Sequence, residues 1–241
     1  MHIPSGQRIS LKISGEFLSG ASKTKHGICW ETLDDICQTL AQLNAYQWVV
    51  ILGGGNFFRG TQGALKCGQG IADAMGMMAT HLNGLALVSG LIQGGVQASL
   101  MTARHVEGVG QTFDVVKAEE LLQKGSVVVC TGGLGHGAMT TDTAAVVRAC
   151  ELGCSWILKG TSVDGIYDKD PKKYPSAQFY PHISYDQAIG EQLEVVDMTA
   201  LILAKTYGKN MAIFSLNNPK GLGGLIEHHL DGSRVDCSGP M

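Results

Sequence analysis

Residues 49–60 read VVILGGGNFFRG, and this stretch decides the class of fold. A short apolar run rich in β-branched residues and closed by glycine is typical of the end of a buried strand. The three glycines at 53–55 leave the turn without side chains, so backbone N–H groups can approach an anion closely. Arg59 follows within reach, and its planar guanidinium suits phosphoryl oxygens. An ordinary glycine-rich turn from a strand to a helix is the alternative that this stretch leaves open by itself.

Strand and helix patterns alternate along the rest of the chain. Apolar runs predict strands at residues 8–13, 49–52, 96–103, 126–130, 155–159 and 212–215. Apolar residues at helical spacing predict helices at 31–43, 71–90, 117–123, 141–150, 184–191, 198–207 and 221–230. An Asp-Gly pair predicts a hairpin-type turn at 163–166. This order predicts an α/β fold, with a largely parallel central sheet covered by helices on both faces.

Three of the predicted strands end in residues that suit phosphate groups. Lys12, Ser14 and Gly15 end the first, residues 53–55 end the second, and a glycine-rich run at 132–135 ends a third. Ligands of parallel sheets bind at the carboxyl ends of the strands, so we expect these turns to converge on one edge. Neither a Walker sequence nor a protein-kinase glycine loop occurs, which disfavours both of those nucleotide-binding folds.

Composition excludes several classes of protein. A net charge of −3 over 241 residues, without a stripe of lysine and arginine, gives no basis for nucleic-acid binding. The seven cysteines are odd in number and scattered, which fits a reducing cytoplasm rather than a secreted disulfide framework. Cys150 and Cys154 are interpreted as small buried hydrophobic residues rather than zinc ligands.

Two segments bear on membranes. Residues 1–10 lack the apolar core of a signal peptide. Residues 74–102 contain no Asp, Glu, Lys or Arg, but they do contain histidine, asparagine, glutamine and a Gly-Gly break. That polarity is wrong for a bilayer span, so we expect no membrane partner and a buried helix at a contact between subunits.

Five ordered motifs resemble those of bacterial uridylate (UMP) kinases in the amino-acid-kinase superfamily. They are LKISGE at 11–16, GGGNFFRG at 53–60, DAMGMMAT at 73–80, TTD at 140–142 and KGTSVDGIYDKDP at 159–171. The resemblance covers nearly the whole chain, and it implies the three-layer α/β/α amino-acid-kinase fold as a single domain over 1–241. It also implies an acceptor-nucleotide lobe at about 1–150 and an ATP-binding lobe at about 151–241.

The resemblance implies phosphoryl transfer from ATP to UMP, with a role for each motif. The catalytic residues would be Lys12, Arg59 and Asp142, with assistance from Lys159. ATP would contact Lys12, Ile13, Ser14, Gly15, Gly55, Arg59, Thr161, Tyr167 and Asp170. UMP would contact Gly54, Asp73, Leu134, Gly135, His136, Gly137, Ala138, Met139, Thr140 and Thr141. It further implies Mg²⁺ held mainly by ATP and water, a homohexamer, and GTP and UTP as effectors.

The residues taken singly also have structural interpretations. Asp73 is predicted to open a helix, where a carboxylate is stabilised by the helix dipole, and it could be a simple cap. Thr141 or Asp142 is expected near the cap of the helix predicted at 141–150. Tyr167 alone would be an ordinary strand aromatic, and residues 168–170 an ordinary charged loop.

The acceptor loop departs most from the family pattern. The usual Gly-Asn-Pro and two large side chains are replaced by GHGAM at 135–139, before Thr140-Thr141-Asp142. Two other functions therefore remain open. One is a sister kinase that acts on a carboxylate, carbamate or phosphonate, and the other is a nucleotide-binding protein without turnover.

Overall fold

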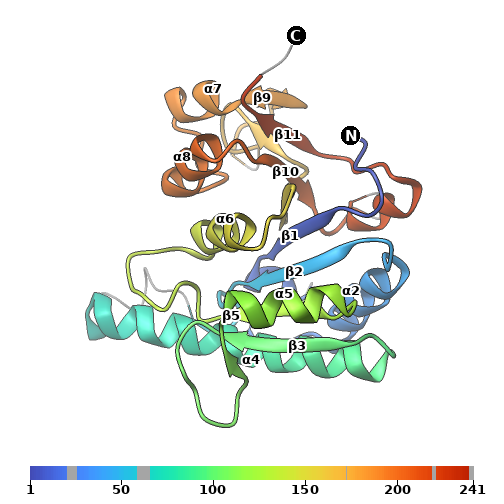
Figure 1. Ribbon diagram of the computed structural model, residues 1–241. Coiled ribbons are helices and arrows are strands. Elements are labelled where there is room, and N and C mark those ends of the chain that lie inside the picture. Colours follow the sequence, from blue (N-terminus) through green and yellow to red (C-terminus); the bar gives the residue numbers. More distant parts are fainter. Residues whose placement is uncertain (21–25, 59–65, 172, 219–220, 239–241) are drawn as a thin grey trace.

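The computed structural model describes residues 1–20, 26–58, 66–171, 173–218 and 221–238. Within these ranges, nine strands form one sheet in the order β4-β3-β5-β2-β1-β6-β10-β11-β9 (Figure 1). Every neighbouring pair is parallel except β10 and β11. The strands are β1 (Arg8–Ile13), β2 (Gln47–Leu52), β3 (Ala98–Thr102), β4 (Gln111–Thr112), β5 (Val127–Thr131), β6 (Trp156–Thr161), β9 (His182–Ser184), β10 (Asn210–Ser215) and β11 (Ser233–Asp236).

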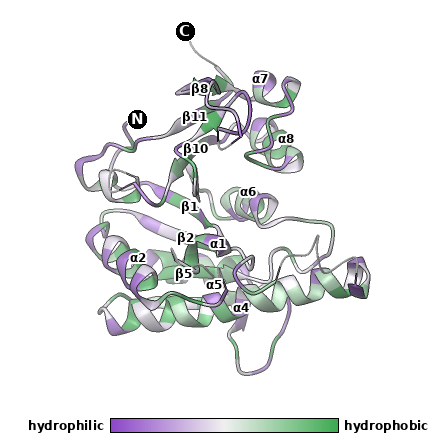
Figure 2. Ribbon diagram, turned by 180° about the vertical axis from the view of Figure 1, so that it is seen from behind, coloured by the Kyte–Doolittle hydropathy of each residue, from purple (hydrophilic) through white to green (hydrophobic). Residues whose placement is uncertain are grey.

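Helices cover both faces of the sheet (Figures 1 and 2). One face packs against α2 (Trp30–Gln42), α4 (Gln69–Gln93) and the 3-10 helix η1 (Leu222–Glu227), with the short α1 (Gly15–Leu18) at its edge. The other packs against α5 (Val115–Gln123), α6 (Thr141–Glu151), α7 (Tyr185–Gly190) and α8 (Met198–Thr206). The predicted three-layer α/β/α fold with a largely parallel sheet is confirmed.

Alternation along β1 shows how the sequence divides the two layers. Leu11 and Ile13 belong to the core beneath α2 and α4. Ser10 lies on the opposite face, where its hydroxyl donates to the Ala145 carbonyl of α6 at 2.9 Å. Successive strand residues point to opposite faces, so Lys12 shares the α6 face with Ser10. This alternation places the one lysine of β1 beside the start of α6.

The helix α4 is long and apolar enough to cross a membrane by length and composition alone. Instead it packs on the sheet through residues such as Ala79, Leu87 and Leu91, and is a partly buried helix of the core. The expectation of a buried helix here is only partly right. Along one side of α4 large apolar side chains remain exposed: Ile71, Met75, Met78, Leu82, Leu85 and Ile92.

Two local predictions were wrong, and some short strands of the sheet were not predicted. The Asp164-Gly165 segment is a bend rather than a hairpin turn, because β7 (Ile166–Tyr167) pairs with the distant β8 (Phe179–Tyr180) and not with β6. The last helix is a short 3-10 helix, since its two glycines weaken an α-helix. The strands β4, β9 and β11 were not predicted, because strands of two to four residues carry little periodic signal.

Candidate active site

The three phosphate-suited turns meet at one edge of the sheet, as expected. They follow β1, β2 and β5, which are neighbours in the order β5-β2-β1. The backbone N–H of Gly53 donates to the Ile13 carbonyl at 2.9 Å, which joins the first two turns. A Cβ atom on Gly15 would lie 2.5 Å from the Gly55 nitrogen, so only glycine permits this approach.

A pair of buried amides supports the glycine turn from below. Asn83 of α4 donates to the Gly53 carbonyl at 2.7 Å and to the Asn56 side-chain oxygen at 2.8 Å. Asn56 donates back to Asn83 at 2.9 Å, and both side chains are fully buried. Sequence analysis did not identify these residues. The signal was present, because an asparagine in an apolar helix must find partners when it is buried.

Two lysines and one aspartate form a buried charged cluster beside the turns. Lys12 of β1 and Lys159 of β6 are register partners in adjacent parallel strands, so their side chains leave the same face. Asp142 lies in the first turn of α6 and bridges them: its Oδ1 is 2.9 Å from the Lys12 ammonium, and its Oδ2 pairs with Lys159. The Lys159 ammonium also donates to the Val195 carbonyl.

The electrostatics of this cluster favour an ionised carboxylate. Burial alone would raise the pKa of Asp142, but the charges of Lys12 and Lys159 outweigh it and lower that pKa to about 2. Burial lowers the pKa of Lys159, and the neighbouring Asp142 offsets part of that change. The cluster therefore holds two cationic side chains around one anion at the carboxyl edge of the sheet.

A first pocket of about 410 Å³ opens between α4 and the loop after β5. The expected acceptor residues that line it are Gly54, Asp73, His136, Gly137, Ala138, Met139, Thr140 and Thr141. We call it the acceptor pocket. The remaining two expected residues lie outside it: the Leu134 side chain packs against the core, and Gly135 is covered by Arg104.

Asp73 holds the acceptor loop. Its carboxylate accepts from the Ala138 backbone N–H at 3.1 Å and from Gln69 at 2.6 Å. Ala138 adopts a left-handed conformation with φ of 63°, which is strained for a residue with a side chain. The prediction that Asp73 opens the helix was wrong, because α4 begins at Gln69 and contains no acidic residue in its first turn.

A second pocket of about 540 Å³ lies between β1, β6 and the segment before α8. The expected ATP residues that line it are Lys12, Ser14, Thr161, Tyr167 and Asp170, and Lys159 joins them. We call it the donor pocket. Ile13 is buried in the core, Gly15 and Gly55 pack against each other beside the pocket, and Arg59 lies outside the described residues.

Thr140 caps α6, and Thr141 and Asp142 follow in its first turn, near the cap as predicted. The Thr140 hydroxyl accepts from the Asp142 and Thr143 backbone N–H groups, and donates to the Asp197 carboxylate. Asp197 also caps α8 and accepts from the Thr143 hydroxyl at 3.1 Å. This contact ties the acceptor loop to α8 across 54 or more residues of sequence, a distance at which periodicity carries no signal.

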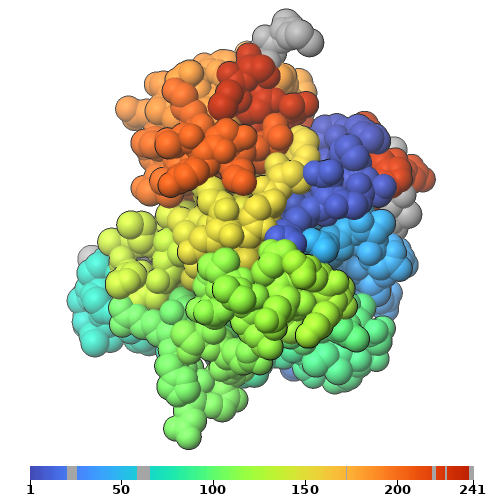
Figure 3. All heavy atoms as spheres, viewed as in Figure 1, coloured from blue at the N-terminus to red at the C-terminus, as the bar shows by residue number. Residues whose placement is uncertain are grey.

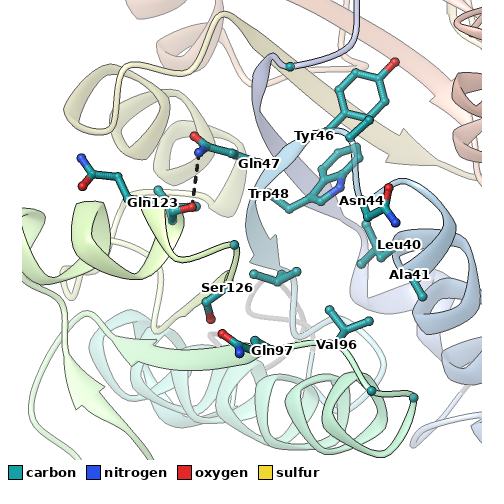
Figure 4. A pocket seen from close by; sticks show the side chains of 17 residues that line it. Leu40, Ala41, Asn44, Tyr46, Gln47, Trp48, Val96, Gln97, Gln123 and Ser126 are labelled. Atoms are coloured by element: carbon teal, nitrogen blue, oxygen red, sulfur yellow. Dashed lines mark hydrogen bonds between the residues drawn. The ribbon is translucent and has the colours of Figure 1, made fainter.

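A larger hollow of about 630 Å³ lies at the opposite edge of the sheet, where β2 and β5 begin (Figure 4). The described residues that line it include no charged side chain, and Gln47, drawn there, donates to the Leu122 carbonyl at 3.2 Å. Phosphate groups require cations or clustered N–H donors. The hollow at the opposite edge is larger but lacks charged side chains, so we place the candidate active site at the carboxyl edge of the sheet, where the lysines and glycine turns lie.

The fold and the paired pockets define a kinase architecture, and the chain belongs to the amino acid kinase family, whose model matches residues 7–215. Among curated relatives, the uridylate kinase of Idiomarina loihiensis is 39% identical over 96% of this chain and 95% of its own. The uridylate kinase of Aliarcobacter butzleri is 40% identical over 90% and 93%. The crystal structure of the UMP kinase from Ureaplasma parvum superposes with a TM-score of 0.89 at 33% identity, covering 97% of this chain and all of that one.

Proposed function

We infer that this chain transfers the γ-phosphoryl group of ATP to UMP, which gives UDP and ADP in pyrimidine nucleotide biosynthesis. One observation carries this function: at two places a residue lines the acceptor pocket and the next residue contacts a side chain of the donor pocket. Gly54 lines the acceptor pocket, while Gly55 packs on Glu16, which lines the donor pocket. Thr141 lines the acceptor pocket, while Asp142 binds Lys12 of the donor pocket. Two anionic substrates bound there would face each other across a cationic junction.

The relatives support UMP as the acceptor. Both curated relatives carry the name uridylate kinase and match this chain over nearly its full length. The acceptor pocket also offers Asp73, whose carboxylate can accept from ribose hydroxyls once it exchanges its bond to the loop. GHGAM at 135–139 differs from the family pattern, so the choice of base is the part of this function that most needs a direct test.

The chemistry requires alignment and charge stabilisation rather than a general base. A nucleoside monophosphate brings a phosphate that is already ionised, so its oxygen can attack the γ-phosphorus in line without losing a proton. Lys12 and Lys159 would neutralise charge that develops on the transferred group, and Asp142 would fix both ammonium groups. Arg59 would add a planar cation, as the family motif implies.

Mg²⁺ is expected to arrive on ATP. Among the described residues no group of three or more His, Cys, Asp and Glu side chains is placed to hold a metal. Asp142, the carboxylate at the junction, is engaged by two lysines. Bound to the β- and γ-phosphates, Mg²⁺ would neutralise part of their charge.

The pockets also suggest how the single domain divides its work. The acceptor pocket is lined by residues between 54 and 141, and the donor pocket mainly by residues between 159 and 195, with three from the first strand and turn. This agrees with an acceptor lobe over about 1–150 and an ATP lobe over about 151–241. One sheet runs through both.

A coupled assay of ADP release tests the function directly. UMP, CMP, dUMP, dCMP and small carboxylates are offered with ATP and Mg²⁺, and UMP is expected to be the best acceptor. Lys12→Ala should lower kcat about 100-fold or more, because it removes a cation from the transferred group. Lys117→Ala, a surface lysine on α5, is the control. Turnover of a carboxylate instead would support the sister kinase, and tight ATP binding without turnover would support a nucleotide-binding protein.

Self-association through α4 is the expected assembly, in a homohexamer located in the cytoplasm. Its exposed apolar side chains recur every three or four residues from Ile71 to Leu85, and Ile92 follows seven residues later, which is the spacing of a helix that packs along another helix. We expect this apolar side of α4 to pack against the same side of α4 in a second copy of the chain. Leu82→Glu should reduce the mass measured by light scattering, whereas Gln38→Glu on the exposed face of α2 should not. GTP and UTP as effectors stay predictions from the resemblance.

A further inference from the structure

The segment between β3 and β4 projects from the molecule, and its base lies against the acceptor loop (Figures 1 and 3). The Ala103 backbone N–H donates to the Thr131 carbonyl of β5 at 2.9 Å, which fixes that base. Arg104 follows, and its stem packs over Gly135. A Cβ atom on Gly135 would lie 2.9 Å from the Arg104 Cγ atom, and Gly135 has φ of 76°. Because Gly135 has no side chain, the Arg104 stem can pack directly against the backbone of the loop.

Arg104 also reaches the next residue of the loop. One guanidinium nitrogen, Nη2, lies 3.4 Å from Nδ1 of His136. A guanidinium has N–H donors, no acceptor, and a charge that it keeps in proteins. The His136 Nδ1 atom must therefore accept this hydrogen bond. In a neutral imidazole the remaining nitrogen, Nε2, then carries the hydrogen and is a donor.

The acceptor loop is thus held at two points by residues from other parts of the chain. Arg104 holds residues 135 and 136 from outside, and Asp73 holds the Ala138 backbone from α4. His136, at the first of these points, lines the acceptor pocket. Since residues 132–140, which form this loop, contain four glycines and no proline, its shape depends on such contacts rather than on its own backbone.

We propose that Arg104 is a positioning residue for base selection, which holds His136 as the Nε2–H tautomer so that His136 donates a hydrogen bond to the position-4 carbonyl of the acceptor base. This inference rests on the proposed UMP kinase function. Uracil and cytosine share the carbonyl at position 2 and differ at position 4, where uracil has a carbonyl and cytosine an amino group. A fixed donor facing position 4 attracts the uracil carbonyl and opposes the cytosine amino group. The Arg104–His136 pair therefore selects UMP over CMP.

The tautomer of His136 provides a test that does not depend on turnover. We would record nitrogen-15 NMR spectra of the histidine rings at about pH 8.5, which is well above the reference histidine pKa of about 6.5. Wild-type His136 should be the Nε2–H tautomer. Arg104→Met, which keeps the stem but has no N–H donor, should show a mixture, and Arg104→Lys should restore the wild-type state. A wild-type Nδ1–H tautomer, or no change in Arg104→Met, would overturn the proposal.

Base selection provides the second test. The ratio of kcat/KM for UMP to that for CMP should fall about tenfold in Arg104→Met, since a neutral hydrogen bond contributes up to about that factor. Arg104→Lys should recover most of the ratio, and Lys124→Met, on the exposed end of α5, should leave it unchanged. An unchanged ratio in Arg104→Met would refute base selection by this pair. If the wild type does not phosphorylate UMP, the proposed function fails, and the NMR result still decides whether Arg104 sets the tautomer.

Discussion

Asp142→Asn tests the electrostatic core of the site, because it keeps the shape of the side chain and removes its charge. Asp142 is 11% exposed and lies between two ammonium groups that are 11% and 13% exposed. Its carboxyl pKa is about 2 in the fold, against an ordinary 3.8, and this difference corresponds to about 2–3 kcal/mol of stability at pH 7. Breaking a buried ion pair costs about 3–5 kcal/mol. We therefore expect the variant to lose about 3 kcal/mol.

The pH dependence gives the sign of the effect. The folded state depresses the pKa of this carboxyl, so the stabilisation is fully present above about pH 4 and is lost as pH falls towards 2. The difference between wild type and variant should therefore be largest near pH 7 and shrink between pH 4 and pH 2.

Urea unfolding followed by circular dichroism at several pH values measures this difference. Asp35→Asn makes the same chemical change on the exposed surface of α2 and is the matched control. The variant should also lose most of its kcat, because Lys12 and Lys159 are no longer held. A loss below about 0.5 kcal/mol at pH 7, or one that stays constant down to pH 2.5, would refute the assignment of Asp142 as the ionised centre of the cluster.

Three further predictions concern the support of the site. Asn83→Ala should lower the free energy of unfolding by about 2–4 kcal/mol, because it leaves the Asn56 side-chain oxygen and the Gly53 carbonyl buried without the donor that they share. Urea titration would measure this loss. Gly54→Ala should lower both stability and kcat, since its Cβ atom would lie 2.7 Å from a Cβ atom of α4, whereas Gly70→Ala meets open space and should be neutral or stabilising in thermal melts. Burial lowers the pKa of His81, so as the pH falls the unfolded state binds a proton at this histidine before the folded state does. Stability should therefore fall as pH drops from 7 to 5, and less steeply in His81→Gln; equal slopes would contradict this.

The sequence determined the class of fold and the edge where ligands bind. When apolar strands alternate with amphipathic helices, few chain topologies can bury both, and this indicated the class of fold. A strand that ends in glycine leaves backbone N–H groups accessible to an anion, and this indicated the edge where ligands bind. Lys12, residues 53–55 and residues 132–135 could be assigned to one edge because parallel strands all present their carboxyl ends together. The motifs then indicated the family, which the comparisons confirmed.

Only the tertiary structure decided which side chains meet. Three hydrogen-bonded pairs join residues that are 30 or more positions apart in the sequence: Asn83 with Gly53, Asp197 with Thr140, and Arg104 with His136. Periodicity reports the direction in which a residue faces but not its partner across an interface, which depends on how helices and loops pack. For the same reason the pairing of Asp142 with both lysines, and the pKa that follows from it, required the register of β1 against β6 and the placement of α6.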